Sequence, residues 1–415
     1  MLVYVLNKHG KPLMPCKSSK ARKLLRDKKA KVIKREPFTI QLLYGSSGYK
    51  QDISLGIDAG SKHIGISATT STKELYASEV ELRNDIVELL ATRRENRRTR
   101  RNRLRYRKPR FHNRVHSKNK GWLAPSIEQK IQTHLKVVEE IHKILPIKNI
   151  IVEIASFDIQ RIKNPEISGE EYQQGEQLNF WNVREYVLFR DGHICQCCKG
   201  KSKNTILNVH HIESRKTGGD APNNLVTLCE TCHKGYHQGA VKLPQSIKRK
   251  ESFKDAAFMG IMRWAFYNKL KELYSNVSMT YGYITKNTRI TNRLEKTHYI
   301  DARCISGNAM AEALGYYFYQ KKVRCHNRQI HKANFLKGGK KKLNQAPYLV
   351  KGYRLFDKVK YDGKYYFIFG RRSSGFFDIR NLKGEKVNKG SISCKKIEFV
   401  ETRKTILTER RLQGA

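Results

Sequence analysis

The chain has 415 residues, and its 83 lysines and arginines outnumber its 37 aspartates and glutamates, which leaves a formal net charge of +46. A charge of this size favours a nucleic acid as partner over a lipid surface. No apolar run approaches the roughly 18 residues that a membrane-spanning helix needs, and charge and proline interrupt the amino terminus where a signal peptide has its apolar core. We therefore expect a cytoplasmic protein that binds no membrane.

The amino-terminal part predicts a small basic module followed by apolar strands. Residues 1–51 predict a strand at LVYVL, a serine-capped helix at SSKARKLLRDKKA and a strand at FTIQLLY. The sequence ISLGIDAGSKHIGIS predicts a tight hairpin of two apolar strands. After an arginine-rich stretch, an amphipathic helix is expected at IEQKIQTHLKVVEEIHKIL and a buried strand at IKNIIVEIA.

The rest of the chain predicts a separate module and a β-rich end. Residues 159–179 are polar and loop-like, and residues 180–240 are rich in cysteine and histidine. One helix is expected at about 254–275 and a second at EKTHYIDARCISGNAMAEALGYYFY. From about residue 319, short alternating strands between glycine and lysine turns predict a small basic β-rich domain.

Ten arginines crowd the stretch between residues 91 and 110, which otherwise has the pattern of a helix. Like charges three or four residues apart destabilise a helix by roughly 0.2–0.5 kcal/mol per pair. Arginine binds phosphate with two hydrogen bonds and stacks on bases, so a nucleic acid would relieve the repulsion. The alternative is a solvated charged helix. The candidate nucleic-acid-binding residues are Arg93, Arg94, Arg97, Arg98, Arg100, Arg101, Arg103, Arg105 and Arg107.

Four of the nine cysteines form two CxxC pairs, which favours metal binding over disulfides. Cys195 and Cys198 form the first pair, and Cys229 and Cys232 form the second. Two such pairs can each hold two corners of a tetrahedron, so we expect a structural Zn²⁺. Cys197 is left over and is expected to be a free buried thiol.

Histidines accompany the cysteine pairs, and they are either surface polar residues or a second site. His210 and His211 end a predicted strand, Asn224 lies in a loop, and His233 and His237 lie four apart on a predicted helix. Phosphodiester hydrolysis needs a general base and a divalent cation. This constellation resembles the HNH nucleases and their ββα-metal fold. The resemblance implies that His211 is the base, that Asn224 orients it, and that His210 and His233 face the metal, with His237 as a further candidate ligand.

Acidic residues at strand ends suggest a third site, although each alone is typical of a solvated or capping residue. Asp58 and Glu153 each end a predicted strand, and His298 and Asp301 lie three apart on one face of a predicted helix. This order resembles the RuvC branch of the RNase H fold, whose carboxylates hold two metal ions. The resemblance implies that Asp58, Glu153 and Asp301 bind Mg²⁺ or Mn²⁺ and that His298 activates the attacking water.

The whole chain resembles the IscB family, transposon-encoded RNA-guided nucleases ancestral to the type II CRISPR effectors. The carriers of this resemblance are KPLMP at residues 11–15, the arginine-rich helix, and an HNH module inserted into a split RuvC core. The implied fold is α/β multidomain. Its expected parts are a PLMP domain (1–51), RuvC-I (52–83), an arginine-rich bridge helix (84–118), RuvC-II (119–158), a linker (159–179), the HNH domain with its four-cysteine zinc site (180–240), a linker (241–253), RuvC-III (254–318) and a carboxy-terminal domain (319–415).

The resemblance implies an RNA-guided, metal-dependent endonuclease that cuts double-stranded DNA. The HNH site would cut the guide-paired strand and the RuvC site the displaced strand, while residues 319–415 would read a flanking motif and part of the RNA. The expected form is a monomer in a ribonucleoprotein with a structured noncoding guide RNA, bacterial and nucleoid-associated. Two alternatives stay open: a guide-free HNH endonuclease of homing or restriction type, and a non-catalytic RNA-binding scaffold.

Overall fold

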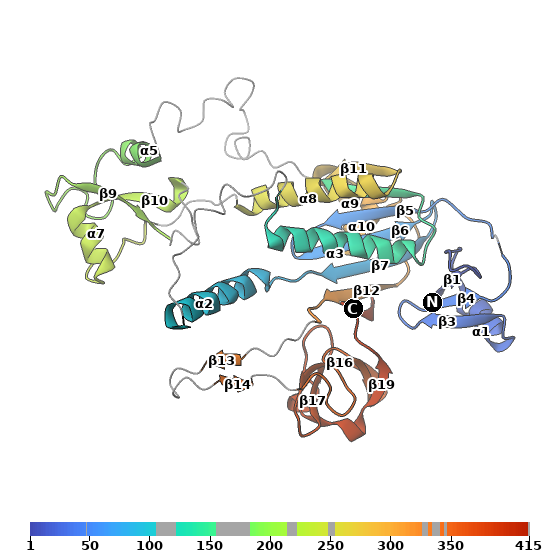
Figure 1. Ribbon diagram of the computed structural model, residues 1–415. Helices are drawn as coiled ribbons and strands as arrows, with labels where there is room; N and C mark the ends of the chain where they lie inside the picture. Colours follow the sequence, from blue (N-terminus) through green and yellow to red (C-terminus); the bar gives the residue numbers. More distant parts are fainter. Residues whose placement is uncertain are drawn as a thin grey trace. The chain divides into compact units, whose positions relative to one another are not determined.

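The computed structural model describes nine stretches of the chain: residues 1–46, 48–104, 122–154, 183–213, 222–247, 254–325, 331–333, 341–343 and 347–413. The chain forms two compact units (Figure 1). One unit consists of Met1–Ala155 and Ile261–Ala415, and the other of Ser156–Gly260. Because the second unit is inserted in sequence, the first unit assembles its core from segments on both sides of the insertion.

The first unit begins with a four-stranded sheet of order β2-β1-β4-β3. Its elements are β1 (Leu2–Leu6), β2 (Cys16–Lys17), α1 (Ser18–Arg26), β3 (Ala30–Lys34) and β4 (Thr39–Leu42). Alternate apolar residues such as Val3, Val5 and Ile40 pack with Leu13 of the KPLMP sequence in one core. The expected serine cap is wrong: Lys17 is the N-cap of α1 and makes no side-chain cap bond.

A seven-stranded mixed sheet of order β11-β8-β5-β6-β7-β12-β20 forms the centre of the same unit. Its strands are β5 (Ser54–Ala59), β6 (His63–Thr69), β7 (Glu74–Glu81), β8 (Asn149–Ile154), β11 (Val277–Tyr281), β12 (Tyr316–Lys322) and β20 (Ile406–Leu412). The predicted hairpin is confirmed as the antiparallel pair β5–β6, and the predicted buried strand is β8, parallel to β5. Parallel neighbours bring the carboxyl ends of β5 and β8 to the same edge.

Helices lie between these strands in sequence. They are α2 (Ile86–Leu104), α3 (Pro125–His142), α8 (Lys254–Leu273), α9 (Gly282–Thr291) and α10 (His298–Ile305). Helices α3 and α8 run side by side (Figure 1), joined by a ring contact of 4.9 Å between His134 and Phe266 and by an ion pair of 2.9 Å between Glu128 and Lys269. Helix α10 lies against β5 and β6.

The second predicted helix, EKTHYIDARCISGNAMAEALGYYFY, is much shorter than expected. Helix α10 ends at Ile305, and β12 begins at Tyr316. Gly307 and Gly315 adopt φ values of +85° and +72°, a conformation that stops a helix and that glycine adopts without strain. The alternating burial of β12 indicates a strand, so the aromatic run was misread as a helix face.

The expected β-rich end is confirmed in residues 347–413. A five-stranded sheet has the order β18-β17-β16-β15-β19, and a separate pair joins β13 to β14. The elements are β13 (His331–Ala333), β14 (Lys341–Leu343), β15 (Lys358–Tyr361), β16 (Lys364–Arg371), β17 (Phe376–Arg380), η5 (Asn388–Gly390), β18 (Ile392–Ser393), η6 (Cys394–Lys396) and β19 (Glu398–Glu401). Val359, Ile368 and Phe377 fill the core of the five-stranded sheet. The chain then returns to the central sheet through β20, which pairs with β12.

The second unit contains a β-hairpin between two helices. Its elements are α5 (Val183–Arg190), β9 (Leu207–His211), η3 (Pro222–Asn224), β10 (Leu225–Cys229) and α7 (Glu230–His237). Strands β9 and β10 are antiparallel, with His211 opposite Leu225. Val226 and Leu228 pack with the cysteines in one small core.

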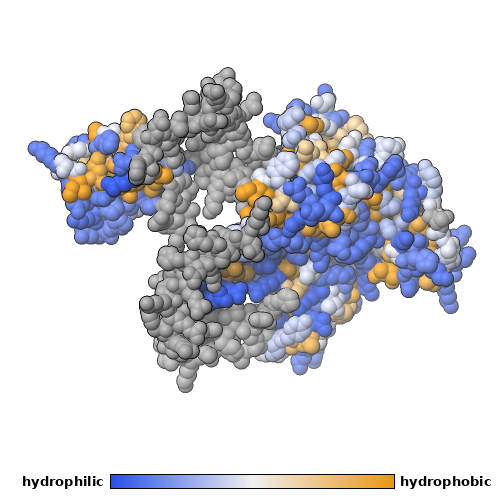
Figure 2. Space-filling view, turned by 45° about the horizontal axis from the view of Figure 1, so that its top comes forward, coloured by the Kyte–Doolittle hydropathy of each residue, from blue (hydrophilic) through white to orange (hydrophobic). Residues whose placement is uncertain are grey.

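Hydrophilic residues cover most of the larger unit on the face in Figure 2, and hydrophobic residues form small separate groups there. This surface agrees with the high net charge of the chain. Within the described residues, every helix is too short or too polar to cross a lipid bilayer.

Candidate metal centres

Four cysteine side chains converge in the second unit. The Sγ atoms of Cys195, Cys198, Cys229 and Cys232 all lie within 4.8 Å of one another. Those of Cys198 and Cys229 are 3.8 Å apart, close to the edge of a tetrahedron around an ion with bonds of about 2.3 Å. This donor set fits a structural zinc ion, which would tie the two CxxC pairs together. Cys197 packs against the cluster without belonging to the four.

Local structure favours the metal-binding form of one of these thiols, that of Cys198. The Lys199 amide donates to the Cys195 carbonyl at 2.8 Å, which closes the turn of the first pair. The Ser202 hydroxyl lies 3.3 Å from Cys198 Sγ, and this hydrogen bond lowers the pKa of Cys198 to about 6. A lower pKa favours the thiolate, which is the form that binds metal. In the second pair, Cys229 ends β10 and is the N-cap of α7.

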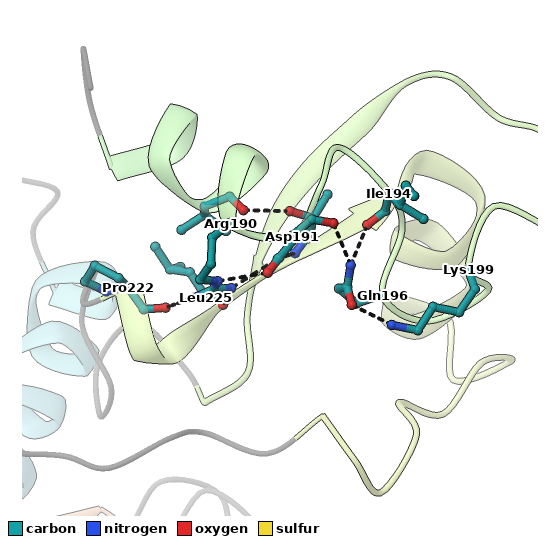
Figure 3. Close-up of polar contacts among 9 residues, drawn as sticks. Arg190, Asp191, Ile194, Gln196, Lys199, Pro222 and Leu225 are labelled. Atoms are coloured by element: carbon teal, nitrogen blue, oxygen red, sulfur yellow. Dashed lines mark hydrogen bonds and ion pairs between the residues drawn. The ribbon is translucent and has the colours of Figure 1, made fainter. Parts of the chain in front are cut away.

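A polar network holds the first cysteine turn against β10 (Figure 3). Arg190 pairs with the neighbouring Asp191 carboxylate at 2.8 Å. The same guanidinium donates to the carbonyls of Pro222 at 2.8 Å and Leu225 at 2.9 Å. The Asp191 carbonyl accepts a bond of 2.8 Å from Gln196, which lies between the cysteines of the first pair. The network therefore fixes the end of α5, the cysteine turn and the start of β10 together.

Three imidazole rings also converge in the second unit. His210 comes from β9, and His233 and His237 come from one face of α7, so their ligand nitrogens lie within 4.8 Å of one another. Burial, with a contribution from the other two rings, lowers the pKa of His210 to about 4. Its buried Nε2 has no hydrogen-bond partner among the described residues. Three imidazoles fit a divalent metal ion, and His237 belongs to the cluster with the other two.

His211 and Asn224 flank this cluster. His211 ends β9, where the alternation of a strand directs its side chain away from that of His210. Asn224 is fully buried, and its amide group donates to the Glu213 carbonyl at 3.0 Å and accepts from the Glu213 amide at 2.9 Å. Asn224 thus fixes the backbone two residues beyond His211. The roles of base and orienting residue stay predictions.

The carboxylates predicted for the third site come from three separate segments of the first unit. Asp58 and Glu153 lie near the carboxyl ends of β5 and β8, and Asp301 lies in the first turn of α10. His298, at the start of α10, lies with its Nδ1 2.7 Å from an oxygen of Asp58. Among the described residues, the three carboxylates do not form a group with all ligand atoms within 4.8 Å. They are spaced more widely than the cysteines and histidines.

Electrostatics nonetheless couple the three carboxylates. Burial, followed by the charge of Asp58, raises the pKa of Glu153, and the same two causes in the same order raise the pKa of Asp301. The hydrogen bond to Asp58 raises the pKa of His298. Three partly buried carboxylates that repel one another are stabilised by nearby cations, as in a divalent metal site.

Two arginines, which sequence reasoning missed, supply part of this positive charge. Arg263 of α8 is buried, with its guanidinium 3.3 Å from Glu153 and 3.8 Å from Asp58. Arg289 of α9 lies 3.0 Å from Asp301. A signal for Arg263 was present in the sequence, because it is the single cation in the apolar stretch FMGIMRWAFY at residues 258–267.

Glycines in β5 and β6 bring α10 close enough to join the site. A Cβ atom on Gly65 would lie 1.9 Å from the His298 carbonyl oxygen, and one on Gly56 would lie 2.0 Å from that of Ala302. Both positions therefore require glycine. Thr297 caps the helix by accepting a bond of 3.3 Å from the Ile300 amide.

The arginine-rich helix is confirmed as α2, and Arg93, Arg94 and Arg97 on it are exposed. Of the other candidate residues, Arg98, Arg100, Arg101 and Arg103 lie on the same helix. Arg105 and Arg107 lie outside the described residues.

Comparison with known proteins identifies two segments. Residues 3–175 match the RRXRR protein family, and residues 97–101 within them read RRTRR. Residues 195–239 match the HNH endonuclease family. Anaredoxin from Nostoc sp. (strain PCC 7120 / SAG 25.82 / UTEX 2576) is 39% identical over 49 residues, which are 12% of this chain and 64% of that protein.

Solved structures of Cas9 resemble the chain distantly. Cas9 of Streptococcus thermophilus in complex with the GGAA PAM has a TM-score of 0.34 and 15% identity, covering 52% of this chain and 30% of that one. The type II-C Cas9 of Actinomyces naeslundii has a TM-score of 0.26 and 10% identity, covering 62% and 60%. The chain thus spans less than two thirds of each of these proteins. The chain therefore carries an RRXRR segment followed by an HNH endonuclease segment, in that order along the sequence.

Proposed function

We propose that the protein is an RNA-guided endonuclease that cuts both strands of a DNA duplex with two separate metal-dependent sites. The observation that carries the proposal is the pairing of two unlike centres in one chain. One is the carboxylate site of Asp58, Glu153 and Asp301, and the other is the histidine cluster within the match to the HNH endonucleases. Two centres in different units suit two strands of opposite direction.

The carboxylate site is proposed as a split RuvC site. The order β7-β6-β5-β8-β11, with an antiparallel half and a parallel half, supports an RNase H-like core. Divalent ions bound there would polarise the scissile phosphate. His298 donates its Nδ1 proton to Asp58, because an ionised carboxylate only accepts, and this leaves Nε2 with a lone pair for a proton of the attacking water.

Arg263 is a further residue of this site. Its guanidinium neutralises Asp58 and Glu153 while no ion is bound, and its Nε donates to the Ala59 carbonyl at 2.8 Å, which anchors it. The side chain therefore keeps two repelling carboxylates in place for an incoming cation. The same location suits a contact with a phosphate oxygen once the carboxylates hold a metal.

The histidine cluster is proposed as the HNH site. His210, His233 and His237 would hold the divalent ion, which lowers the barrier for the leaving oxygen. His211 is proposed to take the proton of the water, with Asn224 fixing the chain just beyond it. The structural zinc would keep the hairpin and α7 in register, because Cys229 ends β10, Cys232 lies in α7, and the first cysteine turn bonds to β10 from the Gln196 amide to the Thr227 carbonyl at 2.9 Å.

The nucleic acids are assigned to the basic elements. Helix α2 is proposed as the bridge helix that lies along the guide RNA, because its exposed arginines lack enough acidic partners in its sequence. Residues 319–415 are proposed to contact RNA and a motif beside the target. We further propose that the HNH site cuts the guide-paired strand and the RuvC site the displaced strand, in a monomeric bacterial ribonucleoprotein.

The nucleic acid content of the protein tests the guide directly. The chain would be expressed with its flanking genomic sequence, and the co-purified RNA would be sequenced. We expect a discrete structured RNA, and Mg²⁺-dependent cutting of DNA that matches its variable segment. DNA cutting without RNA would identify a guide-free HNH endonuclease, and RNA without metal-dependent cutting would identify a scaffold.

A further inference from the structure

A second cluster of metal-ligating side chains shares His298 with the carboxylate site. His63 opens β6, Glu79 lies in β7, and one ligand atom from each of these and from His298 lies within 4.8 Å of the others. The side chains are partly exposed, at 33% for His63, 18% for Glu79 and 43% for His298, so an ion can reach them from solvent.

The sheet register produces this cluster. Gly65 pairs with Glu79 across β6 and β7, and His63 lies two residues before Gly65, so His63 and Glu79 share one face. The same face at Gly65 supports the His298 backbone. All three side chains therefore stand over one small area of rigid backbone.

The contact between His63 and Glu79 has the geometry of two ligands. His63 Nδ1 lies 2.9 Å from Glu79 Oε1, yet this buried nitrogen makes no hydrogen bond among the described residues. The two atoms are therefore close enough to bind the same ion. The rings of His63 and His298 are nearly parallel, with centroids 5.3 Å apart.

The bond between His298 and Asp58 completes the arrangement. Histidine ligands of metals typically donate their other ring nitrogen to a carboxylate, which fixes the tautomer and aims the lone pair. His298 does this toward Asp58 at 2.7 Å. Two imidazoles and one carboxylate favour a transition metal over Mg²⁺, which prefers oxygen ligands.

We propose that His63, Glu79 and His298 form an inhibitory site for a divalent transition metal ion of the Zn²⁺ class. The inhibition rests on the proposed function of the carboxylate site. An ion bound through His298 Nε2 would occupy the lone pair that is proposed to accept a proton from water. A Zn²⁺ ion there therefore stops the cut of the displaced strand and leaves the HNH site, in the other unit, free of this block.

Zinc binding tests the site without any cleavage assay. The whole chain, with its cysteine cluster loaded with zinc and with His210, His233 and His237 replaced by alanine, would be titrated with Zn²⁺ in excess Mg²⁺. We expect one further Zn²⁺ per chain, lost in His63→Ala and in the isosteric Glu79→Gln. Glu81→Gln is the matched control, because Glu81 lies two residues along β7 and pairs with Lys321 at 2.9 Å. Unchanged binding in both His63→Ala and Glu79→Gln would overturn the site.

Cleavage of the displaced strand tests the inhibition. At free Zn²⁺ of about ten times the Kd, mass action predicts a roughly tenfold loss of this cut in the wild type. Glu79→Gln should retain the cut at that concentration. If Zn²⁺ binds yet the cut persists, an ion at this site does not block His298, and the inhibition is refuted. A protein that binds Zn²⁺ but cuts no strand even in Mg²⁺ alone would refute the proposed function instead.

Discussion

His134 of α3 is a neutral histidine buried close to the carboxylate site. It is 1% exposed, and its Nδ1 donates to the Lys130 carbonyl at 2.8 Å. Burial lowers its pKa from 6.5 to about 4. Between these values the unfolded chain holds a proton on this ring and the folded chain does not. The contribution of this ring to the free energy of unfolding is therefore fully present above pH 6.5. It is lost as the pH drops towards 4, by up to about 1.4 kcal/mol per pH unit.

Replacement of His134 should flatten this dependence. His134→Gln lowers stability at neutral pH, because it leaves a buried amide poorly paired, and it removes one titrating group. Urea unfolding at a series of pH values gives the free energy of unfolding as a function of pH. For His134→Gln the slope of this curve should correspond to up to one proton fewer than in the wild type. The exposed His9→Gln is the control and should keep the wild-type slope. Identical slopes for His134→Gln and wild type would contradict the buried neutral ring.

Arg263 should stabilise the protein most when no divalent ion is bound. Removal of one partner from a buried ion pair costs roughly 3–5 kcal/mol. In Mg²⁺-free buffer, Arg263→Met should lower the unfolding temperature by about 5 °C or more, and excess Mg²⁺ should restore most of the loss by neutralising the same carboxylates. Lys269→Met on the same helix removes a half-exposed pair and should change little. Equal melting of Arg263→Met and wild type without Mg²⁺ would show that Arg263 does not compensate these charges.

At the scale of elements, the contact of α10 with β6 decides whether the carboxylate site forms. Gly65→Ala places a methyl group where the His298 carbonyl lies, so α10 must move away from β6. We expect the cut assigned to the RuvC site to fall by about 10²-fold or more, since small misplacements at a catalytic centre cost that much. The other strand should still be cut. Gly45→Ala meets open space and should behave as wild type. Full RuvC cutting by Gly65→Ala would contradict the packing.

Helix α2 should bind guide RNA through its arginine cluster. Replacement of Arg97, Arg98, Arg100 and Arg101 by glutamine should weaken RNA binding and reduce its salt dependence by about 0.7–0.9 log units of slope per lost phosphate contact. Filter binding at several salt concentrations measures both quantities. Replacement of the exposed Lys20, Lys23, Lys29 and Lys31 by glutamine, outside the parts assigned to nucleic acid, removes the same charge and serves as the control. An unchanged slope in the α2 variant would mean that these arginines face solvent.

Elements with strong local signals could be predicted from the sequence. The two CxxC pairs have ligands close in sequence, so their spacing alone indicated the cluster that the structure brings together. The hairpin β5–β6 and the strand β8 followed from apolar runs, and these place Asp58 and Glu153 at one sheet edge. The sequence failed where an aromatic run fits either a helix face or a strand, as it does at β12.

Contacts that depend on tertiary register could not be predicted. Arg263 meets Asp58 and Glu153 because α8 crosses the ends of two strands, and no spacing in the sequence encodes that crossing. His63 and Glu79 meet through the pairing of β6 with β7 and gain a third partner from α10. Likewise, β20 pairs with β12 after the whole carboxy-terminal sheet, so its place in the central sheet had no local signal.

For the whole molecule, the central claim is that two sites cut two strands independently. His211→Ala removes the proposed HNH base, which should slow one cut by about 10²–10⁴-fold. Asp58→Ala removes a ligand of the carboxylate site, which should nearly abolish the other cut. Folding of each variant would be checked by its melting temperature and by its binding of guide RNA.

Strand-resolved cleavage of a doubly labelled DNA target by these two variants tests the claim most directly. We predict that His211→Ala cuts the displaced strand and spares the paired strand, that Asp58→Ala does the reverse, and that the double variant binds guided DNA without cutting it. If either single variant lost both cuts while binding RNA and DNA normally, the two-site account would be wrong, and a single composite site would have to replace it.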